Sequence, residues 1–196
     1  MATLLNETKD NLLKEVNIGG EQLYPILENI VGQEHKYIKD LKINVSNALN
    51  GQYINRKESL LLALAVAINE KNAVLRAGFS TLAIEEGASG PEVAEIAACV
   101  SLLNVNNVFY RFRHFVKKDF YHEAPAGIKM SIMMNPVLGK EFFELVSLVI
   151  SSLNGCEMCV NAHEESLIRL GASESRILEA IKLGAVIKGL SPLVVE

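Results

Sequence analysis

The chain has 196 residues, of which 49% are hydrophobic and 21% are charged, so it is long enough for one domain with a substantial core. Its formal net charge of −4 provides no electrostatic attraction to nucleic acid or to an anionic membrane. Its longest uninterrupted apolar run, Leu60 to Ile68, has nine residues, whereas a membrane-spanning helix needs roughly 20, so this run is expected to form a buried helix.

Helical periodicity extends along most of the chain, and no sustained alternation of apolar and polar residues indicates a strand. Ser89 and Ser173 stand where helix N-caps are expected, and Gly87 and Gly171 follow helical segments where a left-handed residue is favoured. The sequence therefore predicts an all-α domain. The expected helices, in chain order, cover about 20–30, 33–49, 57–69, 73–86, 91–104, 106–117, 139–153, 156–170 and 174–189, with mostly a connection between 119 and 139.

A weak internal repeat suggests how the domain is organised. A shift of 84 residues aligns residues 57–104 with 141–188 and produces seven identities in 48 positions, among them Glu95 with Glu179. We therefore expect residues 1–196 to form a single domain, in which 57–104 is a degenerate repeat and 141–188 carries the reactive groups. In this alignment Cys156, Cys159, His163 and Glu144 stand opposite Asn72, Leu75, Phe79 and Leu60.

The most informative segment contains a pair of cysteines, Cys156 and Cys159. Residues three apart on a helix lie about 5–6 Å from one another, and a disulfide tolerates Cα separations of about 4.4–6.8 Å. The pair can therefore cycle between dithiol and disulfide without unwinding the chain. Because it follows Asn154-Gly155, we expect it in the first turn of a helix, where unpaired N–H groups favour the thiolate.

Two further residues complete a catalytic pattern. His163 follows Cys159 by four residues and Cys156 by seven, which places all three on one helical face. An imidazole there can accept a thiol proton or stabilise a thiolate. Glu144 interrupts an apolar stretch of the preceding helix, where a carboxylate is costly to bury unless it is paired. If the two helices pack antiparallel, Glu144 meets the cysteine face and can accept a proton.

Each of these residues also permits a simpler interpretation. The cysteines could be structural thiols, His163 a surface histidine and Glu144 a solvated residue at a helix edge. The same four residues could instead bind zinc, because they supply four acceptable ligands. Two cysteines on one helical turn hold a less open geometry than a zinc knuckle, and no second pair exists. A non-enzymatic helical scaffold that binds zinc or acts as a redox switch is therefore the alternative hypothesis.

The remaining reactive residues suggest less. Cys99 lies in an apolar helical segment and is expected to be a small core residue, with a redox role as the minor alternative. A basic cluster, defined as Arg111, Arg113, Lys117 and Lys118, is expected to be a solvated helix face or a surface for an acidic partner. Three cysteines are too few for a disulfide scaffold, and the N-terminus resembles no secretory signal, so we expect a cytoplasmic protein.

The pattern Glu144-x11-Cys156-x-x-Cys159-x3-His163 resembles the signature of the alkylhydroperoxidase AhpD group within the carboxymuconolactone decarboxylase-like proteins. The similarity extends over most of the chain and is strongest from about residue 100 onward. Other segments that resemble this group are Asn106-Asn107-Val108-Phe109-Tyr110-Arg111, Met134-Asn135-Pro136, Ser152-Leu153-Asn154-Gly155, Ala162-His163-Glu164 and the stretch from Glu179 to Gly189.

This resemblance implies an all-helical duplicated fold, commonly a homotrimer, in the bacterial cytoplasm. It implies a peroxidase that uses its cysteine pair and no tightly bound cofactor, and that re-reduces a peroxiredoxin with electrons from a lipoyl group on a dihydrolipoamide acyltransferase. By position, Cys159 corresponds to the peroxide-reactive cysteine and Cys156 to the resolving one, while Glu144 and His163 form the proton relay. Met158 departs from well-studied members, which carry histidine there. Decarboxylase activity is not expected, because relatives with that activity generally lack the cysteine pair.

Overall fold

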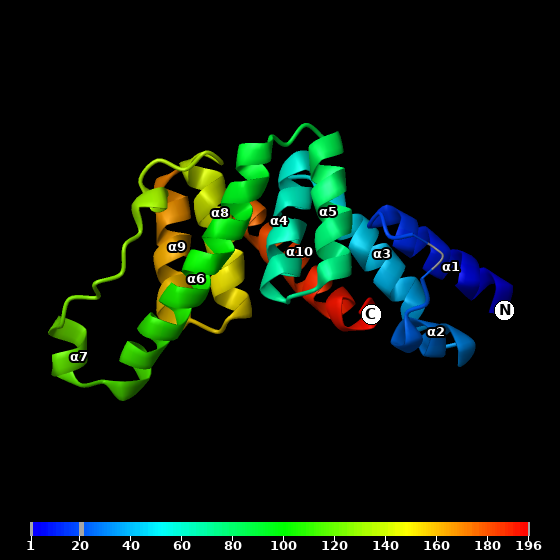
Figure 1. Cartoon of the computed structure of the whole chain (residues 1–196), viewed down its shortest axis with the longest axis horizontal. Helices are drawn as coiled ribbons and strands as arrows, with labels where there is room; N and C mark the ends of the chain where they lie inside the picture. Colours follow the sequence, from blue (N-terminus) through cyan, green and yellow to red (C-terminus); the bar gives the residue numbers. More distant parts are fainter. Residues whose placement is uncertain (1, 20–21, 196) are drawn as a thin grey trace.

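A computed structural model describes residues 2–19 and 22–195, and within those ranges all regular structure is helical (Figure 1). The predicted all-α class is therefore confirmed for the described residues. The α-helices are α1 (Ala2–Glu15), α2 (Pro25–Gly32), α3 (Tyr37–Leu49), α4 (Arg56–Asn69), α5 (Ala73–Glu85), α6 (Gly90–Val116), α7 (Asp119–Glu123), α8 (Lys140–Leu153), α9 (Glu157–Arg169) and α10 (Glu174–Leu190), and two short 3-10 helices cover Ser131–Met133 and Ser191–Leu193.

The first part of the chain differs from the prediction. Helix α1 lies in a segment for which no helix is predicted; its buried face carries Leu5, Leu12 and Leu13 and packs against α3. The helix predicted at 20–30 begins only at Pro25, a residue whose fixed φ suits the first helical position. Residues 20 and 21 lie outside the described part of the chain.

The second difference is that α6 is continuous, whereas the sequence predicts separate helices at 91–104 and 106–117. Asn104 does not end the helix, because its Nδ2 donates to the carbonyl of Val100 at 2.9 Å and to Oδ1 of Asn69 at 3.0 Å. The predicted connection at 119–139 is mostly irregular, as expected, but it includes the short helix α7 and one 3-10 turn.

The predicted helix caps are confirmed. Ser89 accepts a hydrogen bond from the N–H of Glu92, and Ser173 accepts one from the N–H of Arg176. Gly87 and Gly171 have φ angles of 87° and 89°, the left-handed conformation that glycine adopts without strain.

The core is built around α4 and α8, which are each covered by other helices. In α4 every residue from Ser59 to Ala67 is buried, which confirms that the apolar run forms a buried helix. In α8 the buried stretch runs from Phe142 to Ser151 and includes one carboxylate, Glu144. Helices α5, α6 and α10 pack on α4, and α6, α9 and α10 pack on α8. The cysteine-bearing helix α9 is thus held against the second buried helix.

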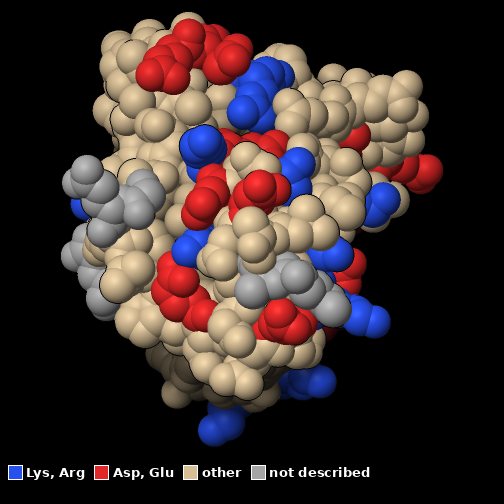
Figure 2. Space-filling model, turned by 90° about the vertical axis from the view of Figure 1, so that its right-hand side faces the viewer, with Lys and Arg blue, Asp and Glu red and all other residues tan. Residues whose placement is uncertain are grey.

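Two parts of the molecule extend from this core in opposite directions (Figure 1). Helices α1–α3 lie at the N-terminal end, where Figure 2 shows positive and negative side chains interspersed on the face in view. At the other end, the second half of α6 projects with α7 as an arm. Length and composition alone would let α6 cross a membrane, but a core helix meets the same criteria. Its contacts with α4, α8 and α9 assign it to the bundle.

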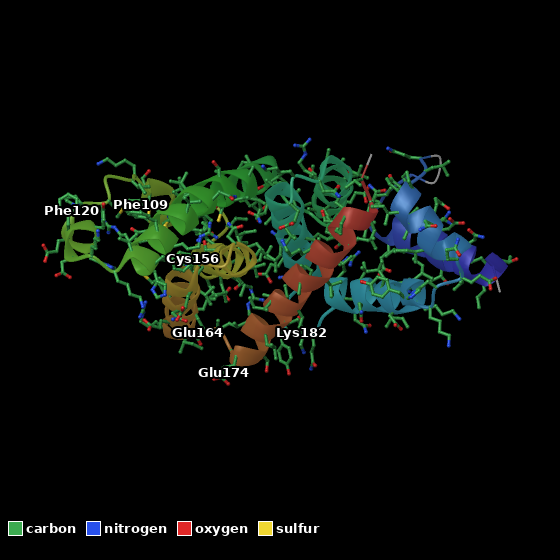
Figure 3. The ribbon with its side chains drawn as sticks, turned by 90° about the horizontal axis from the view of Figure 1, so that it is seen from below. Phe109, Phe120, Cys156, Glu164, Glu174 and Lys182 are labelled. Carbon is green, nitrogen blue, oxygen red and sulfur yellow. A yellow bond between two sulfur atoms is a disulfide. The ribbon has the colours of Figure 1, made fainter. Side chains whose placement is uncertain are left out.

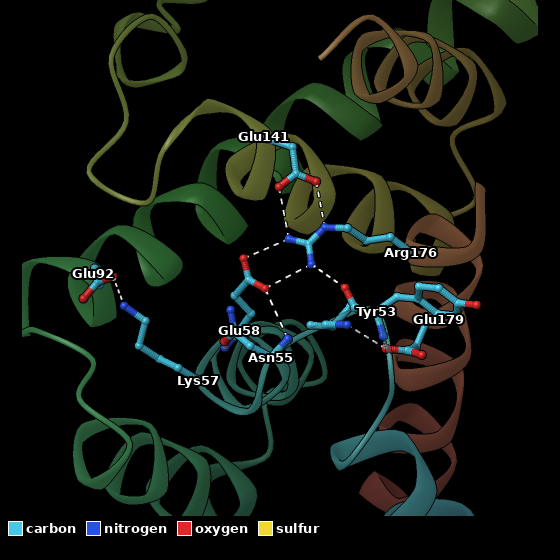
Figure 4. Close-up of polar contacts among 9 residues, drawn as sticks. Tyr53, Asn55, Lys57, Glu58, Glu92, Glu141, Arg176 and Glu179 are labelled. Carbon is cyan, nitrogen blue, oxygen red and sulfur yellow. Dashed lines mark hydrogen bonds and ion pairs between the residues drawn. The ribbon is translucent and has the colours of Figure 1, made fainter. Parts of the chain in front are cut away.

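Partly buried ion pairs join the helices near the start of α4 (Figure 4). Arg176 of α10 binds Glu58 of α4 at 2.8 Å and Glu141 of α8 at 2.9 Å. These two carboxylates raise the pKa of the Arg176 guanidinium against the opposing effect of burial. Glu179, one turn further along α10, accepts hydrogen bonds from the backbone N–H groups of the loop before α4, Gln52, Tyr53 and Ile54, at 2.8–2.9 Å.

Candidate active site

The cysteine pair lies where a tight turn from α8 leads into the first turn of α9. Gly155 adopts a φ of 68°, which lets the chain reverse, and the N–H of Cys156 then donates to the carbonyl of Ser151 at 3.1 Å. Cys156 is the N-cap of α9 and Cys159 lies in its first turn. Their Cα atoms are 5.3 Å apart, and the two sulfur atoms form a disulfide. The predicted compatibility of this spacing with a disulfide is therefore confirmed.

The two sulfurs differ in what surrounds them. Cys156 is completely buried, and its position is labelled in Figure 3. Cys159 is 7% exposed and faces a cavity of about 190 Å³. A small molecule that enters this cavity can therefore contact Cys159 but not Cys156. The cavity is lined by Asn106, Tyr110, Met130, Met133, Met158, Cys159, Ala162 and His163.

Glu144 and His163 meet across the interface of α8 and α9. Oε2 of Glu144 lies 2.6 Å from Nδ1 of His163, and both side chains are nearly buried, with 10% and 12% exposed. Burial of a carboxylate in the apolar stretch of α8 is possible because the imidazole pairs with it. The contact fixes the ring so that it lines the same cavity as Cys159. The Glu144 carboxylate, the His163 imidazole and the Cys159 sulfur therefore belong to one site.

A network of amide side chains holds the turn that carries the cysteines. Asn107 of α6 donates from Nδ2 to Oγ of Ser151 at 2.9 Å and accepts at Oδ1 from Asn154 at 2.9 Å. Asn154 in turn accepts from Asn69 of α4 at 3.1 Å. The backbone carbonyl of Asn154 accepts from Arg111 at 2.5 Å. These bonds join both ends of the turn to α4 and α6.

Sequence reasoning identified neither this network nor the α6 side of the cavity. The available signal was the presence of Asn104, Asn106 and Asn107 in an otherwise apolar part of α6, a pattern that is unfavourable unless the amides have buried partners. The tertiary partners of Asn104 and Asn107 lie about 35–50 positions away in the chain.

The basic cluster proves to be partly structural. Besides the bond from Arg111 to the turn, Arg113 donates to the carbonyl of Ala124 and stacks over the ring of Phe109, with 4.4 Å between the guanidinium carbon and the ring centroid. The exposed cations of the cluster are Lys117 and Lys118. The two arginines therefore hold the arm and the cysteine turn in place.

The geometry of the site does not match a metal centre. Among residues 2–19 and 22–195, no group of three or more histidine, cysteine or acidic side chains is arranged to hold a metal ion. Both sulfurs are joined to each other, and Glu144 is already paired with His163. The donors that could bind zinc thus bind one another in this structure.

Comparison with known proteins finds relatives that match most of the chain. Residues 121–193 match the profile of the carboxymuconolactone decarboxylase family. The chain is 35% identical over 170 residues to "Alkyl hydroperoxide reductase AhpD" from Coxiella burnetii, which covers 85% of this chain and 95% of that protein. Proteins of the same name from Rhizorhabdus wittichii and Mycobacterium marinum are 37% and 34% identical, covering 78% and 84% of this chain and 87% and 92% of their own lengths.

Proposed function

Because the chain belongs to the alkyl hydroperoxide reductase AhpD group of the carboxymuconolactone decarboxylase family, we propose that it is a thiol-dependent peroxidase that reduces alkyl hydroperoxides. The observation that carries this proposal is the disulfide between Cys156 and Cys159, with Cys159 facing the same cavity as an imidazole bonded to a buried carboxylate.

In the oxidative half of the cycle, the Cys159 thiolate attacks the terminal oxygen of the hydroperoxide. A sulfur–oxygen bond forms and the oxygen–oxygen bond breaks, so the sulfur is oxidised to a sulfenic acid and the peroxide leaves as an alkoxide, which takes up a proton and becomes the alcohol. Cys156 then displaces hydroxide from this sulfur, and the products are the disulfide and water. The position of Cys159 on the cavity wall and the complete burial of Cys156 suit these two roles.

His163 and Glu144 supply the proton handling in this proposal. The imidazole can receive the proton of the Cys159 thiol and return a proton to the leaving alkoxide, while the carboxylate at 2.6 Å stabilises the charged ring. The carboxylate also fixes which ring nitrogen remains available toward the cavity, since Nδ1 is the atom that it binds.

In the reductive half, an external dithiol attacks the accessible sulfur of Cys159 and expels Cys156 as a thiolate; its second thiol then closes and releases the reduced pair. We propose a lipoyl group as this dithiol and a peroxiredoxin as an electron acceptor from the pair, as the sequence resemblance implies. Met158 is 39% exposed and lines the cavity, so the neighbour of the attacked sulfur is apolar.

We also propose that the protein works in the cytoplasm as a homo-oligomer, with a trimer as the expected form. The support is an exposed apolar surface along the arm, because patches of this kind mark association sites. Its exposed side chains are Val105, Val108, Phe112, Phe115 and Phe120, and Figure 3 shows Phe120 at the far end of the arm.

The test is a comparison of Cys159→Ser and Cys156→Ser in a stopped-flow assay with tert-butyl hydroperoxide and dihydrolipoamide. We expect Cys159→Ser to abolish turnover, since no thiol then faces the cavity. Cys156→Ser is expected to consume one equivalent of peroxide and stop, because no thiol resolves the sulfenic acid. In the wild-type protein, mass spectrometry should detect a loss of two hydrogens on the peptide that contains both cysteines. Peroxide turnover by Cys159→Ser would contradict the assignment.

A further inference from the structure

Asn106 lies at the cavity with an amide that the structure leaves half used. Only 6% of the residue is exposed. Its Nδ2 lies 3.2 Å from Sδ of Met130, and a thioether is a weak acceptor. Its Oδ1 is enclosed and has no hydrogen-bond partner among the described residues. A buried amide oxygen without a partner lowers stability, so its presence beside a reactive sulfur requires an explanation.

The neighbouring residue shows that burial at this point of α6 does not prevent an amide from being satisfied. Asn107 is 1% exposed, yet it donates to Ser151 and accepts from Asn154, both at 2.9 Å. The two asparagines differ in what they face. Asn107 faces the turn before Cys156, whereas Asn106 lines the cavity together with Cys159 and His163.

The Asn106 amide is one of few polar groups on a largely apolar cavity wall. Three of the lining side chains are methionines, which contribute apolar surface and weakly accepting sulfur. The polar groups on the wall are the Asn106 amide, the Tyr110 hydroxyl and the His163 ring. One nitrogen of that ring is already bonded to Glu144. A polar ligand in this cavity therefore finds in Asn106 a group whose existing bond is easily exchanged.

A hydroperoxide matches a primary amide in its pattern of hydrogen bonds. Its terminal O–H is a donor and its inner oxygen is an acceptor on the adjacent atom, while the amide offers an acceptor and a donor side by side. We propose that Asn106 binds the hydroperoxide group, with Oδ1 accepting from the terminal O–H and Nδ2 donating to the inner oxygen. This inference rests on the proposed peroxidase function. The terminal torsion of asparagine is broad, so exchanging the bond to Met130 for the ligand requires only a turn of the amide.

This binding mode assigns a chemical role to each amide atom. Oδ1 directs the terminal oxygen toward Cys159, where the sulfur–oxygen bond forms. When the oxygen–oxygen bond breaks, its electron pair goes to the inner oxygen, and the hydrogen bond from Nδ2 stabilises the negative charge that develops there. The alkoxide then takes up a proton from the imidazole or from water. Asn106 itself changes neither its oxidation state nor its protonation.

The experiment compares Asn106→Leu with the wild-type protein in two separate half-reactions. Pre-reduced protein is mixed with hydrogen peroxide or with tert-butyl hydroperoxide, quenched by thiol alkylation, and followed by mass spectrometry. Oxidised protein is mixed with dihydrolipoamide in the second assay. We expect the rate constant for peroxide reduction to fall about 10- to 100-fold for both peroxides, since both carry the same O–O–H group. The rate of reduction by the dithiol should change by less than about threefold.

Thermal unfolding supplies the matched control. Leucine has the same number and branching of side-chain heavy atoms as asparagine and removes the unpaired oxygen, so Asn106→Leu is expected to leave the unfolding temperature unchanged or to raise it. Asn107→Leu breaks a satisfied network and is expected to lower it. A second variant, Asn106→Ala, removes the amide without adding bulk and should show the same slow peroxide step.

Four outcomes would overturn the inference. Unchanged peroxide reduction in both Asn106 variants would show that the amide does not touch the substrate. Equal slowing of the peroxide and dithiol steps, or a loss confined to the bulkier peroxide, would indicate a change in cavity shape. A wild-type protein that reduces neither peroxide would refute the proposed function and, with it, this assignment. Only in that last case does the wild-type control itself fail, so the two failures are distinguishable.

Discussion

Cys99 shows how the surroundings of one residue decide its chemistry. It is fully buried, its sulfur lies 3.7 Å from Oγ of Ser147, and burial raises the pKa of its thiol to about 12. The nearby carboxylates of Glu95 and Glu144 act in the same direction. Since the thiolate is the reactive form, almost none of this sulfur is nucleophilic near neutral pH.

We therefore predict that Cys99 takes no part in the redox cycle. In reduced native protein, iodoacetamide should label Cys159 and leave the Cys99 peptide unlabelled, and the latter should react only after denaturation. Cys99→Ala should retain wild-type peroxide turnover. Mass spectrometry of the labelled peptides measures the first result, and a Cys99 sulfenic acid after peroxide treatment of the native protein would contradict it.

The four predicted site residues lie close together in the chain. The residues on the other side of the cavity, which the sequence did not predict, come from distant parts of it. Cys156, Cys159 and His163 share one helical face, so spacing alone relates them, and Glu144 stands out as a carboxylate in an apolar stretch. Asn106 and Met130 reach the same cavity from a helix and a loop whose positions depend on tertiary packing. No local pattern specifies that packing.

At the scale of single elements, the chain's capping residues were readable in the sequence. The start of α6 at Ser89 follows from a serine before proline and Glu92, and the ends of α5 and α9 follow from glycine. The continuity of α6 through Asn104 was not readable, because it depends on hydrogen bonds to α4. Helix α1 was missed for a similar reason, since its apolar face is defined by contact with α3.

The capping box of α6 gives a prediction about acid stability. The N–H of Ser89 and the ammonium of Lys57 both donate to Glu92, at 2.7 and 2.9 Å, and these bonds lower its pKa from 4.5 to about 2, the backbone bond being the larger cause. A carboxyl group with a lowered folded-state pKa stabilises the fold above its unfolded pKa, and this contribution is lost as the pH falls toward the folded value.

Glu92→Gln should therefore be less stable than the wild type at neutral pH, and the difference should shrink between pH 4.5 and about 2. Urea denaturation at a series of pH values measures this difference. The control is Glu85→Gln, which makes the same change of charge at an exposed position of α5. A constant difference for Glu92→Gln would show that the charge is not the cause.

On the scale of the whole molecule, two carboxylates 84 positions apart perform the same task. Glu179 binds the N–H groups of Tyr53 and Ile54 before α4, and Glu95 binds those of Val137 and Leu138 before α8, at 2.7–2.9 Å. The bound residues are also 84 positions apart. Glu95 lies on α6, the third helix of the first repeat, and holds the loop before α8. Glu179 lies on α10, the third helix of the second repeat, and holds the loop before α4. We propose that 57–104 and 141–188 are copies of one ancestral unit that remain joined in this reciprocal way.

The two turns that follow α4 and α8 support the same proposal. The N–H of Asn72 donates to Ala67 at 3.0 Å, and the N–H of Cys156 donates to Ser151 at 3.1 Å, five residues back in each case. Asn72 uses its side chain to cap α5 through the N–H of Leu75 at 2.8 Å. At the corresponding position Cys156 makes no such side-chain cap and instead forms the disulfide. A structural cap in one copy thus stands where the other copy carries chemistry.

This reciprocity predicts that the two carboxylates affect stability alike and activity differently. A hydrogen bond to a charged group contributes about 1.5–3 kcal/mol. Each of these carboxylates accepts at least two such bonds, and their contributions are not fully additive. Glu179→Ala and Glu95→Ala should therefore each lower the free energy of unfolding by about 2–4 kcal/mol. Only Glu95 holds the loop that leads into α8, the helix of Glu144. Glu95→Ala should therefore slow peroxide turnover several-fold at temperatures where both variants remain folded, while Glu179→Ala should not. Chemical denaturation and stopped-flow assays on the same samples measure both effects, and equal turnover in the two variants would argue against a separate role for each loop.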